Sequence, residues 1–178
     1  MTTSRNEASE AAAQDAVTPD PDAAPASLPR AVIGEVFAHA VECYPEECCG
    51  LALGLPGSVP ERVVRCTNVQ NRQLSRGEST LDASRAFWID ERELLEATRS
   101  SESEGQGILV IYHSHVGSAA YFSQQDLRGA LGADGSPLWP GAAQLVVSVR
   151  DGVVREAALF EWDDGARAYR GRRVEEAA

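Results

Sequence analysis

The chain contains no lysine and only three histidines, and no apolar run reaches the roughly 18 residues that a membrane-spanning helix needs. All sixteen basic residues are arginines, so the chain has no side-chain amine with which to form an isopeptide bond to itself. The N-terminal segment also lacks the apolar core that marks a secretory signal. These absences make the cytoplasm the default expectation for its location.

Clustered positive charge is absent as well. The formal net charge is −11, and the arginines form no basic stripe along the sequence. A surface that binds nucleic acid or an anionic membrane needs such a cluster. We therefore expect neither of them as a partner.

Cysteine is scarce and has no recognisable spacing. The four cysteines are Cys43, Cys48, Cys49 and Cys66, and they form no C-x-x-C pair. Two of them are adjacent within an apolar segment, which is typical of buried thiols in a reducing compartment. We expect ordinary core cysteines.

What is present suits one globular domain. With 178 residues and 43% apolar residues, the chain can bury one sizeable core but is too short for two ordinary domains. Residues 1–27 are rich in Ala, Pro, Asp, Glu, Ser and Thr and contain few large apolar residues. This composition predicts a disordered acidic tail, with the folded domain at residues 28–178.

Hydrophobic periodicity predicts a mixture of helices and strands within that domain. The first helix is expected at 29–44, with Ser27 as its N-terminal cap. A second helix is expected at 90–103, where Asp90 and Glu93 resemble a capping box, and a third from Ser123 onward. The expected strands are 47–55, 62–71, 85–89, 107–112, 143–150, 153–162 and 166–172, with a loop at 72–84. The pattern indicates a single α/β (α+β) domain whose mixed sheet is flanked by helices.

Two of the three histidines lie one residue apart, directly after the continuous apolar stretch 107–112. Residues i and i+2 of a strand point to the same face, so His113 and His115 are expected side by side at the end of a buried strand. Asp126 follows in the first turn of the next helix, and the intervening loop is long enough to fold it back. Two imidazoles and one carboxylate leave a fourth position for water, which is the arrangement of a catalytic zinc site. The third histidine, His39, has no visible partner and is expected at the surface or satisfied in the core.

Two further residues are candidates for the chemistry. Glu47 introduces a charge beside the otherwise apolar segment 48–54, which costs stability unless the carboxylate serves a site. It is the candidate base that takes a proton from the zinc-activated water and returns it to the leaving amine. Ser123 is a candidate donor toward the developing negative charge on the substrate.

Each of these signals has an ordinary alternative. An H-x-H pair also occurs in cupins and amidohydrolases, although a cupin would continue in strands and an amidohydrolase barrel needs about 250 residues. A non-haem iron site uses the same types of ligand, so the residues alone leave zinc and iron open. Ser123 and Asp126 also have the spacing of a plain capping box, and Glu47 beside Glu46 also fits a solvated turn.

Taken together, the motifs resemble the JAMM (MPN+) metalloproteases. The resemblance rests on "ECCG" before an apolar strand, then H-x-H, seven residues, Ser, two residues and Asp, and it covers roughly residues 30–173. It implies an MPN fold related to cytidine deaminases, with Zn²⁺ held by His113, His115 and Asp126. It also implies Glu47 as the general acid/base and Ser123 as the residue that steadies the tetrahedral intermediate. The sequence departs from the family at Val116, where a proline is usual, and this removes no ligand.

The resemblance is to the short bacterial branch, because the chain lacks the long insertions with which eukaryotic members grip ubiquitin. It implies a zinc-dependent hydrolase of peptide or isopeptide bonds at the C-terminal tail of a ubiquitin-like or sulfur-carrier protein. Such a tail can lie extended beside a sheet edge. The alternatives are a catalytically silent scaffold module and a metal-dependent hydrolase of a small-molecule amide. The loops 72–84 and 133–141 are candidates for selecting the substrate.

Overall fold

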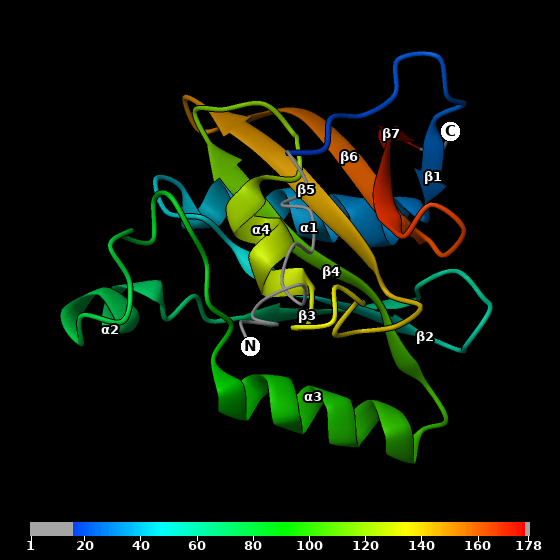
Figure 1. The fold of residues 1–178 in the computed structure, drawn as a ribbon, viewed down its shortest axis with the longest axis horizontal. Helices are drawn as coiled ribbons and strands as arrows, with labels where there is room; N and C mark the ends of the chain where they lie inside the picture. Colours follow the sequence, from blue (N-terminus) through cyan, green and yellow to red (C-terminus); the bar gives the residue numbers. More distant parts are fainter. Residues whose placement is uncertain (1–15, 177–178) are drawn as a thin grey trace, which may run out of the picture.

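The computed structural model describes residues 16–176, which form a curled seven-stranded sheet with helices on both faces (Figure 1). The strands are β1 (Ala26–Leu28), β2 (Cys49–Gly54), β3 (Arg62–Cys66), β4 (Gly107–Val116), β5 (Ala143–Arg150), β6 (Val153–Asp163) and β7 (Ala168–Glu176). The helices are α1 (Arg30–Cys43), α2 (Gln70–Ser75), α3 (Glu91–Ser103) and α4 (Gln124–Ala130). None of the helices in this part of the chain is long and apolar enough to cross a membrane.

The sheet is mixed, with the strand order β1-β7-β6-β5-β4-β2-β3. The histidine-bearing strand β4 lies inside it, antiparallel to β2 on one side and parallel to β5 on the other. The remaining neighbours are antiparallel except β1 and β7, which are parallel. The predicted fold class, an α+β domain with a mixed sheet flanked by helices, is confirmed.

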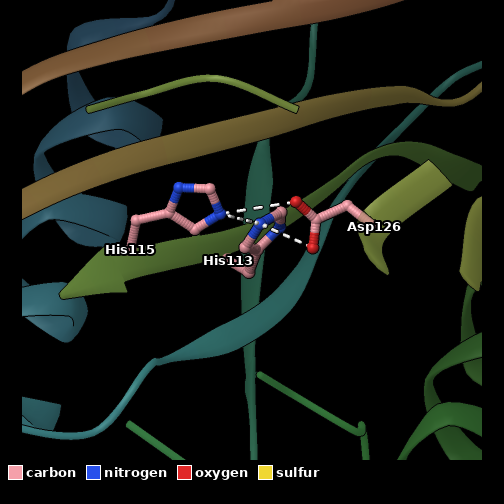
Figure 2. A group of neighbouring side chains, drawn as sticks. All are labelled: His113, His115 and Asp126. Carbon is pink, nitrogen blue, oxygen red and sulfur yellow. Dashed lines mark hydrogen bonds and ion pairs between the residues drawn. The ribbon is translucent and has the colours of Figure 1, made fainter. Parts of the chain in front are cut away.

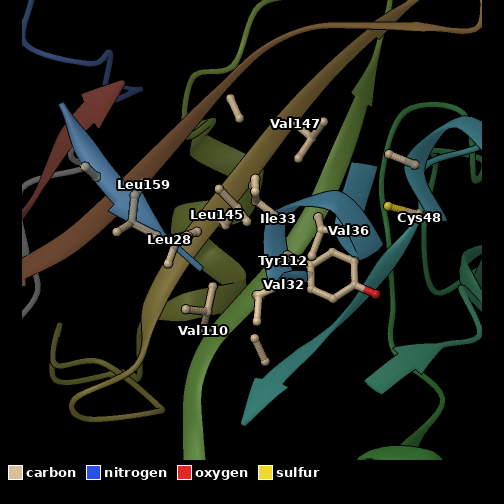
Figure 3. Packing of buried hydrophobic residues seen from close by; sticks show 14 of the residues in the cluster. Leu28, Val32, Ile33, Val36, Cys48, Val110, Tyr112, Leu145, Val147 and Leu159 are labelled. Carbon is tan, nitrogen blue, oxygen red and sulfur yellow. The ribbon is translucent and has the colours of Figure 1, made fainter. Parts of the chain in front are cut away.

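Helix α1 packs against one face of the sheet. Its apolar side chains, among them Ile33 and Val36, meet Tyr112 of β4 and Leu145 of β5 (Figure 3). Because side chains alternate along a strand, Val110 and Tyr112 face α1 while Ile111 faces the opposite side. The histidines at 113 and 115 therefore lie on the face away from α1.

That opposite face is covered by α3 and α4 rather than by α1 (Figure 1). Phe122 and Leu127 from the α4 region pack against Val146 and Phe160 of the sheet. This packing fixes α4 over β5 and β6, next to the end of β4. It brings the first turn of α4, which contains Asp126, close to the histidines.

A buried pair of polar rings joins α1 to β4. The Nδ1 atom of His39 lies 2.8 Å from the hydroxyl of Tyr112, and both residues are buried. Of the two expectations for His39, the satisfied core histidine is the one observed. Gly50 of β2 lies directly beside this pair, because a Cβ at this position would collide with the Tyr112 hydroxyl and the Val64 carbonyl oxygen.

Gly50→Ala is therefore expected to lower the free energy of unfolding by about 1–3 kcal/mol, because the added methyl group forces a shift in a fully packed region. The matched control is Gly34→Ala on the exposed side of α1, where a Cβ meets no atom within 4 Å. That change should raise the free energy of unfolding by ~0.5–1 kcal/mol, because alanine is the better helix former. Urea unfolding of both variants measures the difference, and equal stabilities would contradict the packing described for Gly50.

Several local predictions are wrong. Ser27 lies in β1, and α1 begins after Pro29 without a side-chain cap. The segment predicted as a loop at 72–84 begins inside helix α2, and residues 85–89 form no strand but only a bridge from Ile89 to Asn68. In contrast, Asp90 caps α3 as predicted, with its carboxylate accepting from the backbone amides of the first turn. The predicted capping box is not completed, because the Glu93 carboxylate accepts from the amide and hydroxyl of Thr67 and not from the Asp90 amide.

The predicted boundary of the folded domain also needs correction. Residues 1–15 of the expected disordered tail lie outside the described residues, but several residues between 17 and 27 contact the domain. Val17 exchanges two backbone hydrogen bonds of 2.8 Å with Phe122, and the amide of Asp20 donates to the Gly171 carbonyl oxygen at 2.9 Å. β1 then pairs with β7, and its Ala26 is buried. The sequence pattern did not predict these contacts, because a segment rich in small residues shows little hydrophobic periodicity.

The cysteines are free, as predicted. Cys48, Cys49 and Cys66 are buried, and Cys43 is partly buried. Burial raises the pKa of Cys48 and of Cys66 to about 12. These thiols therefore remain protonated and unreactive at neutral pH.

Candidate metal centre

Strand β4 and helix α4 bring three predicted residues together. His113 and His115 project from the same face of β4, and Asp126 reaches them from the first turn of α4 (Figure 2). The two Nε2 atoms lie 3.2 Å apart. The Nε2 of His113 lies 3.4 Å from Asp126 Oδ1, and the Nε2 of His115 lies 3.4 Å from Asp126 Oδ2. All three residues are buried.

These separations fit a metal ion. Ligand atoms at about 2.0–2.1 Å from a tetrahedral zinc ion lie about 3.3–3.4 Å from one another. The candidate ligand atoms of the three residues all lie within 4.8 Å of each other, and the closest contacts are at the tetrahedral spacing. An ion with zinc-like bond lengths of about 2.0–2.1 Å can therefore be held with little movement of the side chains.

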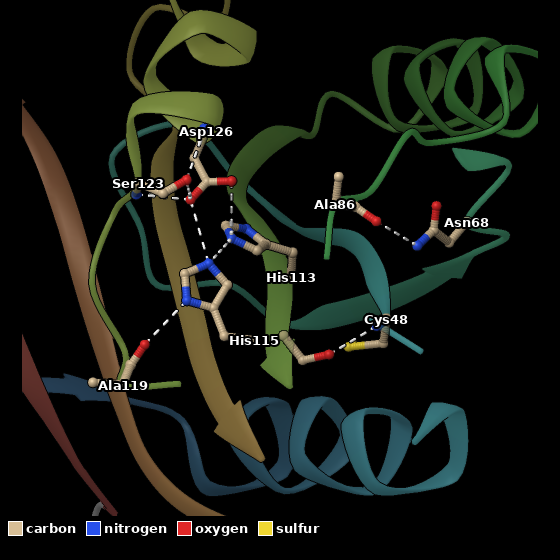
Figure 4. Close-up of polar contacts among 9 residues, drawn as sticks. Cys48, Asn68, Ala86, His113, His115, Ala119, Ser123 and Asp126 are labelled. Carbon is tan, nitrogen blue, oxygen red and sulfur yellow. Dashed lines mark hydrogen bonds and ion pairs between the residues drawn. The ribbon is translucent and has the colours of Figure 1, made fainter. Parts of the chain in front are cut away.

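The hydrogen bond on the far side of His115 orients its lone pair toward the cluster. Its Nδ1 lies 3.0 Å from the carbonyl oxygen of Ala119, which can only accept, so Nδ1 carries the proton (Figure 4). In the neutral ring the unprotonated Nε2 then faces His113 and Asp126. Metal-binding histidines almost always have such a partner on their other nitrogen.

The charges within the cluster favour a cation at its centre. Burial works against an ionised Asp126, but the two imidazoles outweigh it and hold the pKa of this carboxyl well below its usual range. Burial also works against protonation of His115, but Asp126 outweighs it and raises the pKa of His115. The pKa of His113, which is completely buried, is lowered by that burial. An ionised carboxylate thus lies between two ring nitrogens that compete for positive charge.

Ser123 holds the carboxylate in place. Its backbone amide and its hydroxyl both donate to Asp126 Oδ2, at 2.8 and 2.6 Å, and its Oγ accepts from the amide of Asp126 at 3.1 Å (Figure 4). This is the reciprocal capping box that the spacing allowed. Asp126 is therefore both a member of the capping box and a candidate metal ligand.

Glu47 differs sharply from its neighbour in sequence. Glu46 is exposed, whereas Glu47 is only 5% exposed. Its backbone is fixed on both sides, because its amide donates to the Ala83 carbonyl oxygen at 2.7 Å and its own carbonyl accepts from Asn68 at 2.9 Å. The alternative of two solvated acids in a turn is wrong for Glu47.

Burial raises the pKa of Glu47 to about 8, while His115 lowers it and Asp126 raises it further through their charges. The carboxyl group is therefore electrostatically linked to the cluster without being one of its three converging groups. A carboxyl group that titrates near neutral pH can both accept and donate a proton there.

Two aromatic residues that the sequence interpretation missed flank the histidines. Phe87 stacks on His113 with ring centroids 4.4 Å apart, and Tyr121 packs edgewise on His115 at 5.0 Å. Nothing in the sequence links Phe87 to a histidine 26 positions away, whereas Tyr121 is two residues before Ser123. Among the described residues, His113 Nδ1 is the buried side-chain polar atom that lacks a hydrogen-bond partner.

Sequence comparison links this chain to a known domain. Residues 29–160 match the family model described as prokaryotic homologs of the JAB domain. The CysO-cysteine peptidases of Mycobacterium tuberculosis and Mycobacterium bovis are 31% identical over 137 residues, which is 76% of this chain and 81% of theirs. The probable TtuB-protein conjugate cleaving protease of Thermus thermophilus is 33% identical over 103 residues, covering 58% of this chain and 62% of that protein.

Solved structures agree on the fold. A protein from Desulfitobacterium hafniense superimposes with a TM-score of 0.58 at 22% identity, over 85% of this chain and 90% of that one. A protein from Salinibacter ruber gives a TM-score of 0.54 at 25% identity, over 85% and 89% of the two chains.

Proposed function

The chain belongs to the family of prokaryotic JAB-domain proteins, and from this we propose that it is a zinc-dependent peptidase acting on the C-terminal tail of a ubiquitin-like or sulfur-carrier protein. Among its relatives, one is named a CysO-cysteine peptidase and another a probable TtuB-protein conjugate cleaving protease. The observation that carries the proposal is the convergence of His113, His115 and Asp126 close to a buried acid.

In this proposal, His113, His115 and Asp126 hold Zn²⁺. The donor set fits, since one carboxylate and two imidazoles at tetrahedral spacing leave one position open to a fourth ligand. A bound zinc ion supplies a Lewis acid that polarises the scissile carbonyl and lowers the pKa of water to about 7. Ser123 keeps the Asp126 carboxylate oriented toward the two imidazoles, where the metal would be held, through two hydrogen bonds to Oδ2.

Glu47 is the proposed general acid/base. Its carboxylate accepts a proton from the attacking water and then donates it to the nitrogen of the leaving amine. A pKa near 8 suits both steps, because the two protonation states are close in free energy at neutral pH. Burial supplies that pKa, and the fixed backbone around residue 47 keeps the carboxyl group in place.

Ser123 has a second proposed task. Its hydroxyl is the candidate donor to the negative charge that develops on the carbonyl oxygen during attack. In the structure this hydroxyl donates to Asp126 Oδ2 at 2.6 Å, so the donation to substrate requires the hydroxyl to turn away from the carboxylate.

The surroundings of the cluster favour a narrow substrate tail. The three candidate ligands are at most 8% exposed, and Phe87 and Tyr121 lie against the two imidazoles. A tail of small residues can approach buried groups of this kind more easily than a bulky one. Each of the two candidate selection loops also exposes a large apolar side chain, Leu74 in one and Leu138 in the other, which could contact the body of a carrier protein.

We therefore expect a carrier conjugate whose tail ends in Gly-Gly to be cleaved alone or fastest. Matched conjugates ending in Ala-Ala or Val-Gly place a Cβ beside the buried ligands and should be cleaved at least tenfold more slowly. Intact mass spectrometry of the three conjugates, incubated with the zinc-loaded protein, gives the rates. Equal cleavage of all three would contradict selection of a carrier tail and would indicate a less selective peptidase.

A further inference from the structure

The loop that follows the histidines, residues 117–123, is held by contacts from outside the loop on both sides of Ala119. It begins at Gly117, whose φ of +75° turns the chain away from β4. Its Ala119 carbonyl oxygen accepts the hydrogen bond from His115 Nδ1 (Figure 4). The direction of that one carbonyl group therefore decides which nitrogen of His115 faces the cluster.

Two side chains of the neighbouring strands hold the residues before and after Ala119. The hydroxyl of Ser148, on β5, donates to the Ser118 carbonyl oxygen at 2.5 Å. The amide of Ala120 donates to Oε1 of Glu156, on β6, at 2.9 Å. Ser148 and Glu156 are directly opposite each other in the register of β5 and β6, so both contacts to the loop come from one position of the sheet.

The two residues are unusual for their positions. Ser148 is completely buried between Val147 and Val149 of β5, where a hydroxyl group costs stability unless it is hydrogen-bonded. Glu156 is exposed, yet its carboxylate accepts from a backbone amide and forms no ion pair with an arginine of the described residues. A hydrogen bond to a charged acceptor is about twice as strong as a neutral one, and this suits an anchor at the surface.

We propose that Ser148 and Glu156 are positioning residues for the metal centre: by holding the peptide groups on both sides of Ala119, they keep its carbonyl on His115 Nδ1 and thereby keep His115 Nε2 directed at the metal. The proposal rests on the zinc site proposed above. Backbone contacts hold the two ends of the loop: the Gly117 amide donates to the Val149 carbonyl oxygen at 2.9 Å, and Val17 pairs with Phe122. Neither contact involves a residue next to Ala119. Within the loop, the Tyr121 amide also donates to the Ala119 carbonyl oxygen at 3.1 Å. The Val17–Phe122 pairing holds the end of the loop that leads into α4.

The test uses the full zinc-loaded protein with the variants Ser148→Ala, Glu156→Ala and Glu156→Gln. The glutamine keeps an oxygen that accepts from the Ala120 amide, so it separates the hydrogen bond from the charge. Control variants are Ser101→Ala, which removes another buried hydroxyl bonded to a carbonyl oxygen, and Glu161→Ala, which removes another β6 acid, the one paired with Arg172. The first measurement is the zinc dissociation constant, by competition with a chelator.

Loss of either anchor should weaken zinc binding about tenfold, at the lower end of the range for residues that orient metal ligands. Glu156→Gln should stay within about threefold of the unchanged protein, and so should both controls. The second measurement is the ¹⁵N-histidine NMR spectrum, which is simple because the chain has only three histidines. We expect the His115 Nδ1–H signal to be protected from exchange in the unchanged protein and to be lost or exchange-broadened in the two alanine variants.

Zinc binding within threefold of normal in both alanine variants, with the Nδ1–H signal intact, would overturn the proposal. Equal weakening in the control variants would also overturn it, because the effect would then be general destabilisation. Failure of the unchanged protein to bind zinc at all would instead overturn the proposed function on which this inference rests. The two failures are therefore distinguishable.

Discussion

Replacing His115 by alanine is expected to remove most of the zinc from the protein. Only His113 and Asp126 would remain as protein ligands, and two ligands do not hold zinc in a protein site of this kind. The loss of affinity should be on the order of 10²-fold or more, since even disturbing a residue that merely orients a ligand costs about 10- to 100-fold. Elemental analysis of the purified variant, beside chelator competition, measures both the content and the affinity.

The matched control for this variant is His39→Gln. His39 is buried like His115, but it lies on the other face of the sheet and pairs with the Tyr112 hydroxyl. Glutamine keeps a polar group in that position, and zinc content should stay at about one ion per chain. Retention of zinc by His115→Ala, or an equal loss in His39→Gln, would show that the ligands are assigned incorrectly. Iron in place of zinc in the unchanged protein would also contradict the assignment of the metal.

The second large effect is expected from Glu47→Gln. The amide has the shape of the carboxyl group but cannot accept a proton, so turnover should fall by roughly 10²-fold or more, within the range for general acid–base catalysis. Zinc content should not change, because Glu47 is outside the group of converging ligands. Thermal stability should be equal or higher. Burial raises the pKa of Glu47 to about 8, so its ionised form costs folding free energy that the neutral amide does not.

Glu46→Gln provides the control for Glu47→Gln, because it makes the same chemical change one position earlier at an exposed acid. It should leave turnover and zinc content unchanged. If Glu47→Gln lost its zinc, then Glu47 would be a ligand and not the base. If both glutamine variants lost turnover equally, the effect would come from the net charge of this turn and not from the buried carboxyl group.

The residues that carry the proposed chemistry could be predicted because their spacing has direct geometric meaning. The period of a strand places His113 and His115 on one face, and the capping box places Asp126 in the first turn of α4 with its side chain toward Ser123. The apolar run before the histidines predicted an interior strand, and β4 lies between β2 and β5. Local rules were sufficient for these features.

Features that depend on contacts between distant segments could not be predicted in this way. Phe87 reaches His113 from the segment before α3, and Ser148 and Glu156 reach the loop from β5 and β6. The pairing of Val17 with Phe122, which corrects the predicted tail, also joins segments far apart in the sequence. No local pattern encodes such partners, since each residue alone is an ordinary aromatic, polar or small residue in its own segment.

The measurement that tests the central claim most directly is the intact mass of a Gly-Gly-tailed carrier conjugate, incubated with protein that has been stripped of metal. The account predicts no cleavage by the stripped protein, and cleavage directly after the tail once about one equivalent of zinc has been added. The metal should act through His113, His115 and Asp126, so the same addition should not restore cleavage in His115→Ala. Cleavage by the stripped protein, or no cleavage of the conjugate despite stoichiometric bound zinc, would contradict a zinc-dependent carrier-tail peptidase.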